Sequence, residues 1–518
     1  MQRSKTFKNR FYNIMHSERF YYWVAAGIVC ASIGIRLIGL NRGMWLDEYS
    51  SLKVVLSQDF IGQLRAYDHP PLYYILLRLW HFICGSEEFL RLLSVIFGIC
   101  TVIAIMKWMK SYSKLSSLLS GILCAVLPIM TRYSQEIRDY SLLLFATALS
   151  FLFASQVINN PGKRLGYIGL AFALFIAVAT HLIGVMLITT VVLYILTSRL
   201  ITEKKQIKNI LLAILLPISA FIVLYFFFFT NIKKDPNDWW IPAFSFHSDS
   251  YNSVSYVAQC AFEIDHMRIW MHVCACAWAL PFCIKTISKI IICELVVSSL
   301  IFGDWKRSFP LFIAAVSYWV QLAIYSIAVV PIFFDRTALP GMVPFIGFLG
   351  LYVATFRIKR LKTLFVTLFL LLCVIFAMSG IVNDAGRPYE QWGEMIRLLK
   401  ASSKPKDIIL FFPHYTEMPV KYHLDLSNKT VISIRAKSGI DEIKKTISEQ
   451  ILAREQETDR LAVFLVVRKD YNLQKNFKTY SDLNAYLKSE FGQPAFFKEF
   501  DGLTLIKYEA YKKEGAEE

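Results

Sequence analysis

Charged residues are scarce in this sequence. Only 18% of its 518 residues are charged, whereas 55% are hydrophobic and 15% are aromatic, and the mean hydropathy is +0.45. This composition excludes a water-soluble protein, and the length excludes a simple anchor. Apolar runs as long as the roughly 20 residues that a membrane-spanning helix needs recur from Tyr22 to Ile381. We therefore expect a polytopic α-helical membrane protein with about eleven spans.

Cysteine is absent from the C-terminal tail, because the last of the ten cysteines is Cys373. All ten stand in or beside apolar runs, which excludes a disulfide framework. Cys274 and Cys276 are two positions apart and face different sides of a helix, so we expect core packing there rather than a metal site. The first apolar run, 22–40, ends without a small-residue cleavage pattern, which indicates a retained anchor.

Acidic residues are outnumbered, since 39 Asp and Glu oppose 56 Lys and Arg, giving a formal net charge of +17. The basic residues form short clusters between apolar runs, which indicates membrane topology and excludes a nucleic-acid partner. These clusters are 3–10, 107–114, 163–164, 199–208, 306–307 and 357–362. Because basic loops stay in the cytoplasm, we expect a cytoplasmic N-terminus. The loops with acids and histidines, and everything after Ile381, then lie on the outer face.

Two apolar stretches do not fit a simple crossing pattern. Residues 72–82 are short and contain Arg78 and His81, which favours a helix in the outer interface. Residues 269–302 are apolar enough for two crossings, but the charge map requires a net single pass, so we expect one span and an interfacial piece. The predicted organisation is a transmembrane domain at 1–382 with a long first outer loop at 41–90, followed by a soluble domain at 383–518.

The soluble tail alternates strand-like and helix-like patterns, which predicts a small α/β domain. Strands are expected at 407–412, 430–435 and 462–468, helices at 440–460 and 480–491, and a hairpin at 495–500 and 503–508 with its turn at Asp501-Gly502. The tail contains no Gly-rich phosphate loop, so we expect no nucleotide site.

Ionisable residues recur where the predicted spans end on the outer face. Asp47 and Glu48 follow the first span, and such a carboxylate can act as a general base or bind a divalent cation. Asp68 and His69 precede two prolines that restrict the backbone. The alternative for each pair is a solvated polar group beside an interface, which is common at helix ends.

Further along the chain, two arginines are candidates for holding a phosphate group. Arg138 can bind phosphate with two parallel N–H groups while Glu136 orients it, although an ion pair within the loop is an equal alternative. Arg336 can hold a phosphate or diphosphate head group, or be neutralised by its neighbour Asp335. His181 stands where two apolar runs meet and needs a partner or water there.

These residues occur in an ordered set of short strings, each of which is weak alone. The strings are WLDEYSS, DHPPLYYILLRLW, FLRLLSVIFG, YSQEIRDYSLLL, THLIG and FFDR. In this order, over residues 22–382, the chain resembles the C-type integral-membrane glycosyltransferases. It is most similar to the bacterial branch of lipopolysaccharide-core and aminoarabinose transferases and protein O-mannosyltransferases. The tail resembles the small outer domain of many members.

The resemblance implies transfer of a sugar, with inversion, from a polyprenyl-phosphate donor to a lipid, glycan or protein acceptor on the outer face of a bacterial inner membrane. By motif, Asp47 is the implied base with Glu48 beside it, and Arg91 is the arginine at the first loop's end. Asp68 and His69 match the polar pair before the prolines, and Glu136 the second acidic position. Members differ in whether they bind a divalent metal, for which Asp47, Asp68, His69 and Glu136 are the candidates.

Three other functions remain as alternatives. A transporter or flippase of lipid-linked sugars would carry its polar residues at mid-membrane and show inverted repeats, which this sequence lacks. A surface-glycan ligase or polymerase would have its large loop late in the chain, whereas the charged loop here comes first. A structural scaffold leaves the boundary acids without a role.

Overall fold

The chain forms two units, each with its own core. The computed structural model describes residues 17–67, 69–198, 204–229, 244, 304–384, 390–435, 438–455, 460–469 and 477–511. The membrane unit comprises Met1–Leu40 and Val54–Gly386, and the C-terminal unit comprises Asn41–Lys53 and Arg387–Glu518. The first part of the loop that we predicted at 41–90 thus packs with the C-terminal residues rather than with the helices.

Among the described residues, seven helices of the membrane unit are long and apolar enough to cross a membrane. They are α2 (Glu18–Leu37), α6 (Glu87–Lys110), α9 (Tyr140–Asn159), α12 (Lys204–Leu224) with its π-helical extension η2 (Tyr225–Phe229), α16 (Trp305–Ala328), α17 (Asp335–Thr355) and α18 (Lys359–Asp384). Shorter apolar helices are α7 (Lys114–Val126), α10 (Arg164–Thr180), and η1 (Leu182–Val185) with α11 (Met186–Ser198). The prediction of a multi-pass membrane protein is confirmed, and the single pass predicted at 269–302 lies outside the described residues.

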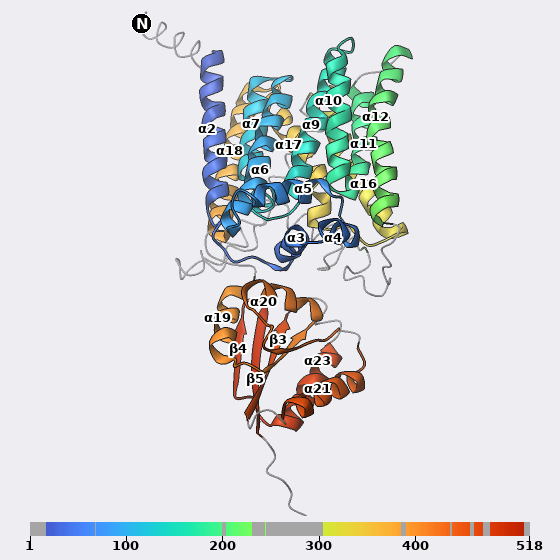
Figure 1. Ribbon diagram of the computed structural model, residues 1–518. Coiled ribbons are helices and arrows are strands. Elements are labelled where there is room, and N and C mark those ends of the chain that lie inside the picture. Colours follow the sequence, from blue (N-terminus) through green and yellow to red (C-terminus); the bar gives the residue numbers. More distant parts are fainter. Residues whose placement is uncertain are drawn as a thin grey trace, which may run out of the picture. The chain divides into compact units, whose positions relative to one another are not determined.

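Helix α17 is the centre of this bundle (Figure 1), because its whole apolar stretch is buried while α2, α12 and α18 leave most of theirs exposed. The helix approaches α7 closely at Gly350, where a Cβ atom would lie 2.1 Å from Ser120 Oγ. Small residues allow such close approach of helices in membranes. The outer helices therefore meet lipid, and α17 is held within protein.

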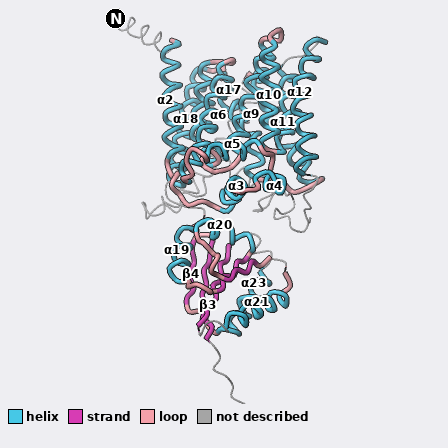
Figure 2. Tube along the Cα trace, viewed as in Figure 1, coloured by secondary structure: helices cyan, strands magenta, loops and turns pink. Residues whose placement is uncertain are grey.

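The two ends of the bundle differ in charge. Lys110 is the last residue of α6, and Lys114 is the first residue of α7. Both form ion pairs with Glu18 at the start of α2, at 3.2 and 3.0 Å. The turn that joins α9 to α10 and contains Lys163 lies at the same end (Figure 2). At the opposite end α9 and α17 begin, α10 ends, and the short helices α4 (Phe60–Ala66) and α5 (Leu72–His81) lie across the bundle (Figure 1). Helix α5 is the helix predicted at 72–82.

The C-terminal unit is built on a mixed five-stranded sheet with the order β2-β1-β3-β5-β4. The strands are β1 (Ile408–Phe412), β2 (Thr430–Ser433), β3 (Arg460–Arg468), β4 (Phe496–Phe500) and β5 (Leu503–Tyr511). β1 pairs in parallel with β2 and β3, whereas β5 pairs antiparallel with β3 and β4. Its helices are α19 (Trp392–Ser402), α20 (Glu417–His423), α21 (Ile440–Glu455) and α23 (Phe477–Phe491), with a 3-10 turn η5 (His414–Thr416).

The predicted α/β domain is thus confirmed, including its closing hairpin, where Gly502 has a φ of +74° that suits glycine. One face of the sheet packs on α21 and α23, with Ile443, Ile447 and Leu483 in the core. The sequence patterns did not reveal α19 and α20, which are short.

Candidate active site

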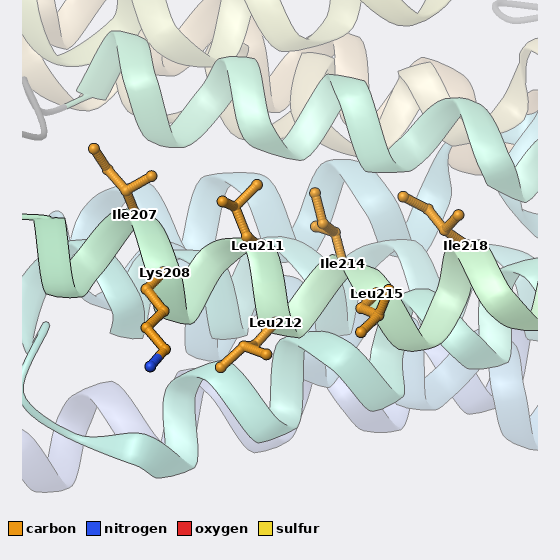
Figure 3. Close-up of a pocket in the computed structure, with 7 residues that line it drawn as sticks. All are labelled: Ile207, Lys208, Leu211, Leu212, Ile214, Leu215 and Ile218. Carbon is orange, nitrogen blue, oxygen red and sulfur yellow. The ribbon is translucent and has the colours of Figure 1, made fainter.

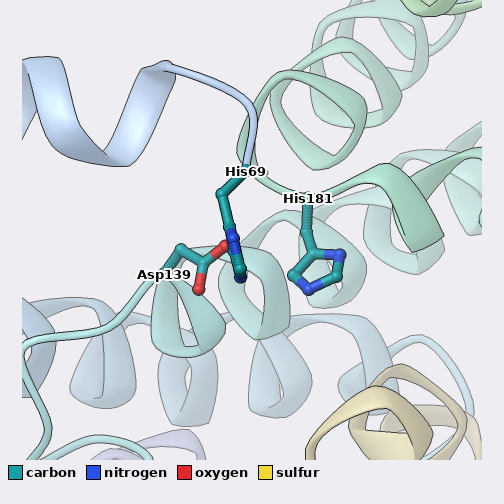
Figure 4. Close-up of side chains that lie close together, drawn as sticks. All are labelled: His69, Asp139 and His181. Carbon is teal, nitrogen blue, oxygen red and sulfur yellow. The ribbon is translucent and has the colours of Figure 1, made fainter. Parts of the chain in front are cut away.

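Three connections at the end of the membrane unit that lies opposite the basic turns bring ionisable side chains together (Figure 4). His69 precedes α5, Asp139 directly precedes α9, and His181 follows α10. A nitrogen of each histidine and a carboxylate oxygen of Asp139 all lie within 4.8 Å of one another. We call these three residues, with Arg138 and Tyr67, the polar cluster. His69, Arg138 and His181 were predicted as site residues, and the fold brings them together.

Arg138 fixes the ring of His69. Its Nη2 lies 3.1 Å from His69 Nε2, and its Nη1 donates a hydrogen bond of 2.6 Å to the Tyr67 hydroxyl. Because a guanidinium group only donates, His69 Nε2 accepts, and the neutral ring carries its proton on Nδ1. The Tyr67 ring stacks on the His69 ring with centroids 5.0 Å apart. His69 is therefore held as a donor of one N–H group.

His181 is held by a tight turn of the chain. Its Nδ1 accepts the Ile183 N–H at 3.3 Å, which caps η1 and leaves the proton of the neutral ring on Nε2. The turn folds back so closely that a Cβ atom at Gly184 would lie 2.4 Å from the Ala177 carbonyl oxygen. The rings of His181 and His69 meet edge to face, with centroids 5.2 Å apart. The cluster thus presents a second imidazole in a defined tautomer.

Asp139 is the member of the cluster that the sequence analysis missed as a site residue. Its side chain is completely buried, and neither carboxylate oxygen has a hydrogen-bond partner among the described residues. An unsatisfied buried polar group costs about 1–3 kcal/mol, and a charged one costs more. Such groups in folded proteins call for an explanation, and a missing ligand is one. The signal available in the sequence was an acid beside Arg138 at the start of a span.

The polar cluster does not fit a resident metal ion in this arrangement, although it is the closest grouping of metal-ligating types among the described residues. A cation needs a lone pair from each imidazole. His69 Nε2 already accepts from Arg138, and His181 Nδ1 already accepts from Ile183. The other nitrogen of each neutral ring carries its proton, so a metal would have to displace one of these bonds.

A second arginine and an aromatic wall adjoin the polar cluster. The guanidinium groups of Arg138 and Arg336 lie 5.6 and 6.0 Å from the centroid of the Tyr140 ring. Tyr140 also packs against the His181 ring, at 5.9 Å between centroids. At the start of α17, Asp335 Oδ2 accepts a 2.5 Å hydrogen bond from the Tyr133 hydroxyl. Arg138 and Arg336, which were both predicted to hold a phosphate group, therefore lie against the same Tyr140 ring. Asp335 is hydrogen-bonded to Tyr133.

Two other predicted residues, Arg91 and Glu136, make contacts with other parts of the membrane unit. Arg91 is buried and donates to the Leu40 carbonyl oxygen at 2.6 Å, so it ties α6 to the end of α2. Glu136 is buried with its Oε1 3.5 Å from Arg132 Nε, an ion pair with a different arginine from the Arg138 considered in the sequence analysis. Asp68 lies outside the described residues.

Asp47 and Glu48 belong to the C-terminal unit, in the first turn of α3 (Leu46–Leu56). Glu48 is completely buried, and its Oε2 accepts the Trp45 N–H at 3.2 Å. A glutamate that reaches back to the residue before a helix is a common capping arrangement. Glu48 therefore caps α3, and Asp47, the second residue of α3, is half-buried.

An apolar groove runs along α12 (Figure 3). It is lined by Ile207, Lys208, Leu211, Leu212, Ile214, Leu215 and Ile218. Its one charged residue, Lys208, belongs to a cluster predicted as cytoplasmic. The groove contains no acid or histidine, so it offers no chemistry, and its apolar side chains suit contact with lipid.

Residues 68–226, which contain the whole polar cluster except Tyr67, match the family model described as dolichyl-phosphate-mannose-protein mannosyltransferase. Two crystal structures of ArnT from Cupriavidus metallidurans are similar to the whole chain, each with a TM-score of 0.54. The apo structure is 12% identical and covers 94% of this chain and 97% of its own. The structure bound to undecaprenyl phosphate is 11% identical and covers 95% and 98%.

An oligosaccharyltransferase from Archaeoglobus fulgidus, tethered to an acceptor peptide, is 10% identical over 95% of this chain and 74% of its own, with a TM-score of 0.49. No curated protein sequence matches the chain. The predicted fold is confirmed, because the chain has the fold of ArnT over nearly its whole length. Within this fold, the segment with the polar cluster is the part that matches the mannosyltransferase family.

Proposed function

We propose that this glycosyltransferase takes a sugar from a polyprenyl-phosphate donor and transfers it, with inversion, to a hydroxyl group of a lipid, glycan or protein acceptor. The polar cluster binds the head group of the donor on the outer face of a bacterial cytoplasmic membrane, and the polyprenyl chain stays in lipid. The family match and the undecaprenyl phosphate bound to the similar ArnT fold support this donor.

The observation that supports the proposal is the buried carboxylate of Asp139, which lies beside three side chains that donate and has no hydrogen-bond partner in the part of the chain that the structure describes. The donors are Arg138, His69 and His181. Cationic and N–H groups suit the phosphate, whose negative charge grows as the bond to the sugar breaks. The oxygens of Asp139 suit a hydroxyl group of the sugar, which would supply the missing hydrogen bonds.

The reaction needs one more group, which takes the proton from the acceptor. Asp47 is our candidate for this base. The acceptor oxygen attacks the anomeric carbon as Asp47 takes its proton, the bond from that carbon to the phosphate oxygen breaks, and polyprenyl phosphate leaves with the electron pair. Attack opposite the leaving phosphate inverts the anomeric carbon. Arg138 and Arg336 stabilise the departing phosphate.

The test uses the full chain in vesicles with a labelled sugar on polyprenyl phosphate and an extract that supplies acceptors. We expect label to move from the donor to an acceptor in the wild type. Asp47→Asn should lower kcat, and Arg336→Gln should raise the KM for the donor. Arg357→Gln changes an exposed arginine just beyond the other end of α17 and serves as the matched control.

Two outcomes would overturn the proposal. If label crosses the membrane while it stays on polyprenyl phosphate, the protein is a flippase of lipid-linked sugars. If Arg336→Gln and Arg357→Gln behave alike, the cluster end of α17 does not bind the donor phosphate.

A further inference from the structure

A buried glutamate joins three parts of the C-terminal unit that are far apart in the sequence. The Glu390 side chain is almost completely buried, with 6% of its surface exposed. Its Oε2 accepts the Leu46 N–H at 3.1 Å and the Trp392 indole N–H at 2.5 Å. Its Oε1 accepts the Arg468 Nε–H at 2.6 Å. Both oxygens are therefore used, and the charge is balanced by Arg468.

The Leu46 amide is the first one of α3, the helix whose second residue is Asp47. The first amides of a helix have no partner within the helix, and a carboxylate stabilises them through hydrogen bonding and through the helix dipole. Here Glu390 takes the Leu46 N–H, while Glu48 takes the Trp45 N–H. Two buried carboxylates thus fix the backbone on the N-terminal side of Asp47.

A second set of contacts holds the same helix one turn further on. Tyr49 is buried, and its hydroxyl lies 2.8 Å from His423 Nε2. Its ring packs edge to face on Trp392 and Tyr422, at centroid distances of 6.5 and 5.6 Å. Residues of α19 and α20 therefore contact α3 at Tyr49, after Asp47 in the sequence, while Glu390 contacts it at Leu46, before Asp47.

We propose that the C-terminal domain positions the catalytic acid, with Glu390 as the main positioning residue and Tyr49 with His423 as the second. We call these contacts the α3 clamp. The proposal rests on the proposed function, because it takes Asp47 as the base. Glu390 accepts from Leu46, Trp392 and Arg468, so we infer that it acts through the direction in which α3 presents Asp47.

The proposal predicts a loss in the chemical step rather than in donor binding. A misplacement of about 1 Å in a reacting group can cost about 100-fold in rate. Glu390→Gln replaces one carboxylate oxygen, which accepts hydrogen bonds, with an amide NH2 group. This NH2 group faces N–H donors and cannot accept from them. We expect kcat to fall roughly 10- to 100-fold while the KM for the donor changes less than about twofold. Tyr49→Phe, which keeps the ring, should lower kcat less.

The decisive experiment pairs transfer kinetics with hydrogen exchange, both on the full chain in detergent micelles or vesicles. Backbone amides of residues 44–50 should exchange at least about tenfold faster in Glu390→Gln than in the wild type, because a protected amide loses its acceptor. Glu394→Gln is the matched control, since Glu394 lies in α19, which begins two residues after Glu390, and is exposed. It should alter neither exchange nor kcat.

Exchange and kinetics together support or overturn the α3 clamp and its positioning role. Faster exchange with a lower kcat and an unchanged KM supports the proposal. Unchanged exchange in both Glu390→Gln and Tyr49→Phe overturns the clamp, and faster exchange with an unchanged kcat overturns its positioning role. If the wild type transfers no sugar, the proposed function fails, while the exchange comparison still supports or overturns the clamp.

Discussion

Two buried acids, one in each unit, differ in their hydrogen bonding. Glu390 in the C-terminal unit has three N–H groups on its two oxygens. Asp139 in the membrane unit is as deeply buried and has none. A satisfied buried carboxylate holds structure together, whereas an unsatisfied one keeps its binding capacity for something that arrives. The contrast distinguishes a residue that holds the protein structure from one that can bind a ligand.

The contrast is tested most strongly at Asp139. Asp139→Asn removes a buried charge without partners, so activity and stability should move in opposite directions. We expect sugar transfer to fall by about 10²–10⁴-fold, as for the loss of a directly engaged acid. The free energy of unfolding should rise by about 1–3 kcal/mol. Transfer assays and thermal unfolding of the purified protein measure the two effects, and a loss of both would show that Asp139 is structural.

Arg138 comes second, because it donates to both His69 and Tyr67 and faces the proposed phosphate. Arg138→Gln should raise the KM for the donor by about 10- to 100-fold, since hydrogen bonds to charged groups contribute about 1.5–3 kcal/mol. Arg132→Gln removes the neighbouring arginine that pairs with Glu136 and provides the comparison. Equal changes in the two variants would argue against a specific phosphate contact.

Glu390 should show the reverse of Asp139 in stability. Glu390→Gln leaves Arg468 without its buried partner, so the free energy of unfolding of the C-terminal unit should fall by about 1–3 kcal/mol. The emission of Trp392, whose indole bonds to Glu390, reports the transition. An unfolding curve identical to that of Glu394→Gln would contradict the account of the α3 clamp.

The smallest effect expected concerns pH. Burial lowers the pKa of His423 below its ordinary value, so the folded protein favours the neutral ring that bonds to Tyr49. Its contribution to stability is complete above the unfolded pKa of about 6.5 and is lost as the pH falls through the lower folded pKa. His423→Gln should flatten this part of the dependence of the melting temperature on pH. A slope that persists in the variant would assign the effect to another group.

Sequence patterns predicted the architecture well, because hydrophobic runs, basic turns and strand alternation are local signals. The strands of the tail and the helix at Leu72–His81 followed from them. His69, Arg138 and His181 stood out because ionisable residues are costly at the ends of apolar runs. Their convergence depends on how α5, α9 and α10 pack, which periodicity does not encode.

The misses have the same physical origin. The sequence analysis considered Glu136 as the acid that accompanies Arg138 and passed over Asp139, although within the described residues the oxygens of Asp139 have no hydrogen bond. Glu136, the acid that the family pattern favoured, lies against Arg132 instead. Glu48 looked like a partner of Asp47, but its position three residues after Trp45 made it a cap. Glu390 gave no signal, because its partners are distant in the chain.

The α3 clamp also sets an order of events during biosynthesis. Leu46 and Glu390 are 344 positions apart, so at about 5–20 residues per second the ribosome reaches Glu390 roughly 20–70 seconds after Leu46. Throughout that interval the start of α3 lacks its acceptor, and it gains one only when residues 387–518 have been made and folded. A chain interrupted among its later spans would carry Asp47 without its support. Synthesis of the C-terminal unit thus has to precede the full support of the start of α3.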